Sequence, residues 1–347
     1  MLPSGWTEEC SVCVPLPEVE LCGSHASEEA SKLSELEGDF ASEDEGRRIE
    51  ALEAIASLTR SHTNAPSRRV AQCLARRLDE ETPAVRKRAA ELLADGQHPA
   101  IALDALLSSL KSAQREVEQV DRAFEAFRKK WAKLTKQKKL GATPSMEEVK
   151  ESMKTLAAMG DESQALKEEM FDTGTARDAM VTALGKLRDE RATKALLDVH
   201  RKGVVPLGRV AINEALLEHG TRGTLKRIVG DFKDVEKAIS RQRKELEKER
   251  RARLPKAPSN YKTEAAKRGW EQRVEAEREQ KLDSLAGGIE AKLASLRASH
   301  DRLLAFALSH GLPDGPAWSE KPYLPWTRWL DANADALPES LGRLPGT

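Results

Sequence analysis

From residue 46 onward, apolar residues recur at steps of three and four, with charged residues between them. This spacing places the apolar side chains on one face of an α-helix, so it predicts a succession of amphipathic helices. Pro66, Pro83 and Pro99 each precede an apolar stripe, as is typical of the start of a helix. Helices of about 12–15 residues are only marginally stable alone in water, so we expect them to stack against one another.

The same helical pattern returns at residues 175–232 with an internal repeat. A period of 20–50 residues built from two-helix units is typical of an α-solenoid. Three pairs of residues at an offset of 32 keep their residue type, namely Arg177 and Arg209, Ala183 and Ala215, and Leu184 and Leu216.

Two helix–turn–helix strings, residues 84–110 and 176–199, share a set of features. Each has an arginine near the start of its first helix, alanine and leucine at core positions, a short turn with Gly or Asp, and a Leu-rich second helix. In these features the chain resembles the HEAT-repeat family, in its short bacterial variety, over residues 46–110 and 175–232. The resemblance implies a scaffold that binds other macromolecules along a solenoid surface.

Two further segments have a coiled-coil pattern. Nine apolar residues from Leu106 to Leu134 alternate at steps of four and three, which keeps one seam facing a partner helix. A Met-rich apolar stripe follows and predicts the return arm of an antiparallel helical hairpin, residues 111–172. This seam is either buried within the hairpin or meets another chain over part of its length. A longer coiled-coil arm is predicted at residues 233–310.

The two ends of the chain differ in composition from the helical blocks. Residues 1–50 hold thirteen acidic and three basic residues, a net charge of −10, and few large apolar side chains. We therefore interpret residues 1–45 as an acidic, largely disordered tail that contains cysteine. The C-terminal strap is rich in proline and tryptophan, and its Trp318, Trp326 and Trp329 either dock on the body of the protein or form an exposed motif for a partner.

These patterns predict an all-α fold, a short split HEAT-like α-solenoid with a helical-hairpin insertion and a long coiled-coil arm. The predicted order is the tail (1–45), the first HEAT-like block (46–110), the hairpin (111–172), the second block (173–232), the arm (233–310) and the strap (311–347).

Composition agrees with helices and excludes several classes of protein. Aromatic residues make up 4% of the chain and charged residues 33%. No apolar run approaches the ~18 residues of a membrane-spanning helix, so we expect no membrane insertion. The first residues lack the pattern of a secretory leader, which favours a cytoplasmic location, with an exported form that has lost its leader as the alternative.

The 57 basic and 57 acidic residues cancel, but the charges are segregated. Residues 128–139 and 241–270, at the predicted arm tips, each carry a net charge of +7. Such segments are solvated helix faces, sites for phosphates or nucleic acid, or sites that the acidic tail occupies. The candidate partner-contacting residues at the tips are Arg128, Lys129, Lys130, Trp131, Lys133, Arg250, Arg251 and Arg253.

Cys10, Cys13, Cys22 and His25 form two closely spaced pairs. Four such ligands suit a tetrahedral structural zinc ion. In an oxidising compartment the same thiols would form a disulfide, and the third alternative is that they are unmodified. We predict no other cofactor, since the six remaining histidines lie near predicted helix ends, where free carbonyl groups favour them.

The chain has no Gly-rich phosphate loop, no Gly-x-Ser-x-Gly motif and no His-Glu-x-x-His motif. We therefore predict a non-enzymatic scaffold that mediates interaction with an unknown protein partner. The alternative is a nucleic-acid or phosphate-binding protein that uses the basic arm tips. An enzyme built on a repeat scaffold is a third class.

Overall fold

The computed structural model describes residues 23–62, 68–96, 98–137, 146–202, 208–255, 257 and 263–344. Within these ranges the chain forms eleven α-helices and one short 3₁₀ helix and contains no strand, which confirms the all-α fold class. None of these helices combines the length and the apolar run that crossing a membrane requires. The chain divides into two compact units: unit 1 runs to His219 and resumes at Leu341, and unit 2 is Gly220–Ser340.

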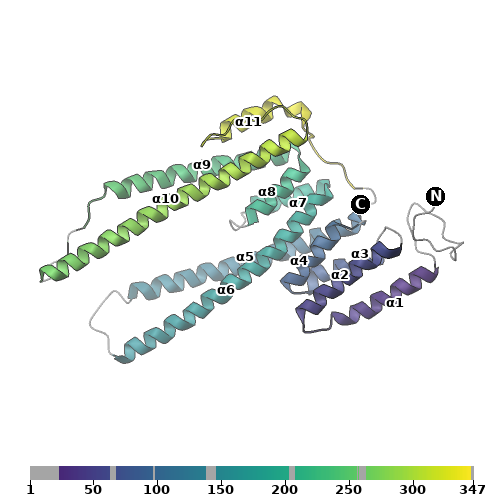
Figure 1. Ribbon diagram of the computed structural model, residues 1–347, viewed down its shortest axis with the longest axis horizontal. Coiled ribbons are helices and arrows are strands. Elements are labelled where there is room, and N and C mark those ends of the chain that lie inside the picture. The colour runs from purple at the N-terminus through teal and green to yellow at the C-terminus, as the bar shows by residue number, and fades with distance from the viewer. Residues whose placement is uncertain are drawn as a thin grey trace. The chain divides into compact units, whose positions relative to one another are not determined.

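In unit 1, α4, α5, α7 and α8 pack against α6, while α3 packs on α4 and α5, α2 packs on α4, and α1 packs on α2 (Figure 1). Leu106 of α5, Leu184 of α6 and Leu216 of α8 are fully buried in this core. The described helices of the unit are α1 (Gly23–Asp39), α2 (Glu45–His62), α3 (Arg68–Glu80), α4 (Pro83–Ala94), α5 (Pro99–Gln137), α6 (Met146–Leu187), α7 (Glu190–Arg201) and α8 (Gly208–His219).

Helix α6 is longer than predicted, because it runs unbroken through the expected boundary between residues 172 and 173. One interior glycine, Gly174, costs about 1 kcal/mol relative to alanine, which is too little to end the helix. The apolar stripe continues past it through Ala176 and Met180, both at most 1% exposed. The hairpin and the second helical block therefore share one helix, and α5 likewise joins the first block to the outgoing arm.

Residues 23–45 correct the prediction of a largely disordered tail, because they contain helix α1 and the start of α2. Leu33 and Phe40 are buried, and the Arg77 guanidinium lies 4.0 Å from the centre of the Phe40 ring. Two large apolar side chains thus anchor this acidic segment within unit 1, and the average composition of the segment did not reveal them. Residues 1–22 lie outside the described residues.

Unit 2 is built on an antiparallel pair of long helices, α9 (Arg222–Arg251) and α10 (Glu264–Ser309), with α11 (Tyr323–Ala332) packed on α9 and a 3₁₀ helix at Ala334–Ala336 (Figure 1). Ile289, Leu296 and Leu303 of α10 lie seven residues apart and are all buried, as a heptad seam requires. At the distal end, Arg278 of α10 donates hydrogen bonds to backbone carbonyls in the last turn of α9 (2.7 and 3.0 Å).

Candidate functional site

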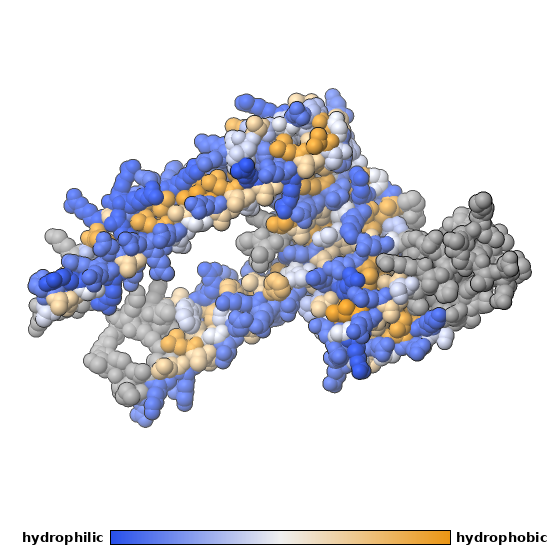
Figure 2. All heavy atoms as spheres, in the orientation of Figure 1, coloured by the Kyte–Doolittle hydropathy of each residue, from blue (hydrophilic) through white to orange (hydrophobic). Residues whose placement is uncertain are grey.

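The apolar seam of the α5–α6 hairpin is buried near its base and exposed toward its distal end. Val117 and Phe127 are 3% and 8% exposed, whereas the next seam residue of α5, Trp131, is 39% exposed. On α6, Leu156 and Met153 are 45% and 66% exposed. Figure 2 shows hydrophobic side chains toward the end of this hairpin. We call the hairpin tip the set of Arg128, Lys129, Lys130, Trp131, Lys133, Met153 and Leu156.

Four cations of α5 lie within three residues of Trp131 along the chain. Arg128 and Lys130 form ion pairs with glutamates of α5 and α6, each at 2.7 Å. Lys129 and Lys133 are exposed and form no ion pair with any described residue. Exposed pairs stabilise a protein by less than about 1 kcal/mol, so the two paired cations remain able to exchange partners. All five residues that the sequence predicted at this tip lie on α5, within two turns of the helix.

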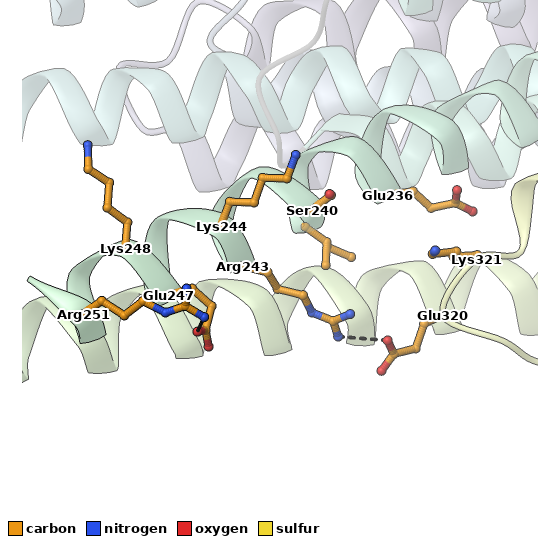
Figure 3. A pocket seen from close by; sticks show the side chains of 10 residues that line it. Glu236, Ser240, Arg243, Lys244, Glu247, Lys248, Arg251, Glu320 and Lys321 are labelled. Carbon is orange, nitrogen blue, oxygen red and sulfur yellow. Dashed lines mark hydrogen bonds and ion pairs between the residues drawn. The ribbon is translucent and has the colours of Figure 1, made fainter.

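A groove of about 520 Å³ follows one side of α9 in unit 2 (Figure 3). Its acidic side chains are already engaged. Glu236 accepts a hydrogen bond from the backbone N–H of Tyr323 (2.8 Å), Glu320 pairs with Arg243 (2.9 Å), and Glu247 pairs with two arginines of α9 (3.4 and 3.5 Å). The groove is lined by Glu236, Ile239, Ser240, Arg243, Lys244, Glu247, Lys248, Arg251, Glu320 and Lys321.

The three arginines predicted at the tip of this arm have different surroundings. Arg250 and Arg251 both pair with Glu247, and Arg251 also lines the groove. Arg253 is exposed just beyond the end of α9. These three arginines lie at one end of a longer basic surface on α9. Most residues of that surface were not among the predicted partner-contacting residues.

The C-terminal tryptophans lie largely inside unit 2. Trp326 and Trp329 are 0% and 9% exposed, and the indole N–H of Trp329 donates to the backbone carbonyl of Asp314 (3.1 Å). Trp318 is half-buried, with its ring 5.3 Å from the ring of His300. This burial corrects the inclusion of Trp326 and Trp329 among the partner-contacting residues, since their rings pack against their own chain.

The predicted zinc ligands cannot be placed, because Cys10, Cys13 and Cys22 and the side chain of His25 lie outside the described residues. Within the described ranges, no three or more His, Cys, Asp or Glu side chains gather in a way that would hold a metal ion. Cys73 is buried in unit 1, and this burial, together with the nearby Glu37 carboxylate, raises the pKa of its thiol. Its environment is therefore that of a protonated core thiol.

His219 ends α8 and is fully buried in unit 1. Its Nε2 lies 3.1 Å from the backbone carbonyl of Leu184, so Nε2 carries the hydrogen and donates it. Its Nδ1 then accepts the single hydroxyl hydrogen of Thr193, 2.6 Å away, in competition with the backbone carbonyl of Asp189, which lies 3.0 Å from the same hydroxyl. Burial, aided by the charge of Arg188, lowers the pKa of His219, so the imidazole is neutral at pH 7.

We expect unit 1 to lose stability as the pH falls below 6.5, the ordinary pKa of this side chain. The unfolded chain then binds a proton at His219 that the folded chain does not bind until a lower pH, so acid favours unfolding. Hydrogen exchange of amides in α6–α8 at pH 5 and pH 7 measures the loss. His219→Gln keeps a donor for the Leu184 carbonyl and should show a smaller pH dependence. An equal dependence in both proteins would disprove this assignment.

Asp189 anchors a distant segment, and the sequence held no signal for it. Its buried side chain caps α7 by accepting from the backbone N–H of Arg191 (2.7 Å), and it also accepts from the backbone N–H of Leu344 (2.8 Å), 155 residues away. Burial acts to raise the pKa of Asp189, but these two N–H donors bring it below its usual value. Residues 341–344 are thereby attached to unit 1.

Comparisons with protein-family models, with curated proteins and with solved structures found nothing that matches this chain.

Proposed function

We propose that this chain is a non-enzymatic scaffold that binds a protein partner through the hairpin tip. The observation that carries the proposal is the exposure of Trp131, Met153 and Leu156 toward the end of a hairpin whose seam is buried near its base. Large apolar side chains grouped on a surface are typical of interaction sites. Tryptophan in particular is enriched among the residues that dominate binding energy.

The charges around the tip indicate the chemistry of the partner. Arg128 and Lys130 lie beside Trp131 on the surface of α5 and form only exposed ion pairs, whereas Lys129 and Lys133, two residues from Trp131, project from the opposite side of the helix. A partner helix with an apolar face and acidic flanks would cover the indole ring of Trp131 and the thioether of Met153 while its carboxylates approached the Arg128 and Lys130 side chains. The methionine adds a flexible, polarisable surface that adapts to such a helix.

The rest of unit 1 supplies the scaffold in this proposal. The short helices α2–α4 and α7–α8 follow one another with the lengths and apolar stripes that underlie the HEAT-repeat resemblance. A stack of such helices would hold the hairpin as a projecting arm, since α5 and α6 each run from the stack into the arm.

Site-specific photo-crosslinking in cells that naturally produce the chain tests the proposal. A crosslinking amino acid at position 131 should capture one discrete protein, whereas the same group at Lys111, an exposed position of α5, should not. Trp131→Ala should weaken binding of the captured partner by about 30-fold, the effect of losing about 2 kcal/mol at an interface hot spot. Capture of the same proteins from both positions, or full affinity of the alanine variant, would contradict the proposal.

A further inference from the structure

Helix α9 carries a straight stripe of five exposed cations. Their steps of four, three, four and three residues place them along one side of the helix, over about 21 Å at 1.5 Å per residue. We call the α9 stripe the set of Lys237, Arg241, Lys244, Lys248 and Arg251.

Much of the positive charge of the stripe is not compensated. Arg241, Lys244 and Lys248 form no ion pair with any described residue. Lys237 and Arg251 have only the loose pairs with Asp234 (3.9 Å) and Glu247 (3.4 Å).

The groove beside the stripe adds to this charge. Lys244, Lys248 and Arg251 line both features, and Lys321 adds an ammonium group near Glu236, at the end of the groove away from Lys248 and Arg251 (Figure 3). The three glutamates that line the groove are engaged by the contacts described above. Glu245 and Glu247 are exposed beside the stripe, so a ligand at this surface meets five cations and two flanking carboxylates, an excess of positive charge.

The stripe lacks the features that other classes of ligand need. From Lys237 to Arg251 the helix has no aromatic residue, and its two large apolar side chains, Ile239 and Leu246, are buried. A protein interface needs apolar anchors at its centre, and single-stranded nucleic acid is held by aromatic side chains on which bases stack. Stable binding to a bilayer surface generally adds apolar insertion to charge. A duplex, in contrast, offers a rigid line of phosphates that a line of cations suffices to bind.

We propose that the α9 stripe binds the phosphate backbone of double-stranded nucleic acid without regard to its sequence. This binding is a second activity, independent of the protein partner at the hairpin tip. From the sequence, both basic arm tips were candidate sites for nucleic acid. In the structure, the line of uncompensated positive charge lies on α9. No base-reading side chain is required, because phosphate contacts carry no sequence information.

Fluorescence anisotropy with the full chain and a labelled 25-base-pair DNA duplex tests this proposal. Five phosphate contacts give a slope of log affinity against log salt of about −4.5, so raising the salt from 50 to 200 mM should weaken binding about 500-fold. The variant Lys244→Ala with Lys248→Ala loses two contacts, which lowers the slope to about −2.7 and the change to about 40-fold. Both lysines are exposed on a helix, where alanine is well tolerated.

A matched control separates the stripe from the net charge. Lys111→Ala with Lys167→Ala removes the same charge from exposed positions of α5 and α6 that belong to neither proposed site, and should leave the affinity and the slope unchanged. A second duplex of unrelated sequence should bind with the same affinity within about twofold. Absence of binding at 50 mM salt, equal losses in the two double variants, or stripe-dependent binding to vesicles with anionic lipid but not to DNA would each overturn the proposal.

Discussion

Replacing Trp326 with alanine is expected to lower the free energy of unfolding of unit 2 by about 3–5 kcal/mol, as for other truncations of large buried aromatic residues. Trp326 is fully buried, and its ring lies 5.2 Å from the ring of Trp329 and 5.6 Å from that of His300. Its indole N–H is buried and meets no hydrogen-bond acceptor among the described residues. The loss should therefore come from packing, and Trp326→Phe should recover part of it.

Hydrogen exchange of the full chain measures this effect as reduced protection of amides in α10 and α11. Leu324→Ala is the matched control, because Leu324 lies on the same helix and is 59% exposed. Its free energy of unfolding should change by no more than about 0.5 kcal/mol. If Trp326→Ala left the protection of α10 and α11 at its wild-type level, the strap would not stabilise unit 2 through this ring.

Gly185→Val is expected to destabilise unit 1 by about 3 kcal/mol, at the upper end of the usual cost of overpacking. A Cβ atom at Gly185 would lie 2.8 Å from both the Cα and the Cβ of Ala215. These atoms belong to the backbone and the first side-chain carbon of α8, so they cannot rotate away. Helices α6 and α8 would have to separate, which would open the core around Leu184 and Leu216.

The control is a substitution at Gly174, on the same helix, and its expected effect on the stability of unit 1 is opposite in sign. Gly174 has no atom within 4 Å of the position that a Cβ would take. Gly174→Ala should therefore stabilise unit 1 by about 0.5–1 kcal/mol, because alanine favours the helix. Hydrogen exchange of amides in α6 and α8 measures both changes. Destabilisation of similar size in both variants would show that the close approach of α6 and α8 is not the cause.

The periodic parts of the fold could be predicted from the sequence, since a seam with a fixed period depends only on local helix geometry. The buried seams through Val117 and through Leu296 follow from spacing alone. The ends of helices were harder to predict. Helix α6 continues past Gly174 because its later residues pack against other helices, and these contacts cannot be derived from local sequence. Leu33 and Phe40 show the same difficulty, since two residues in an acidic segment decide its packing.

The candidate sites could be predicted only in part, for a related reason. Sequence analysis located the cations and Trp131 at the hairpin tip, but burial of the strap depends on tertiary packing. Trp131 and Trp326 therefore looked equivalent in the sequence, although they are 39% and 0% exposed. The α9 stripe was visible as a spacing of charges, yet a search for apolar periodicity does not detect it.

The link between Asp189 and Leu344 has a consequence for the order of events during synthesis on the ribosome. Unit 2 is one continuous stretch and can fold once residue 340 has emerged, whereas unit 1 is discontinuous and includes the later residues from Leu341. Until Leu344 emerges, the Asp189 carboxylate lacks one of its N–H donors, and a buried carboxylate without its partners is costly. The unit that begins first in the chain is thus the last to reach its full stability.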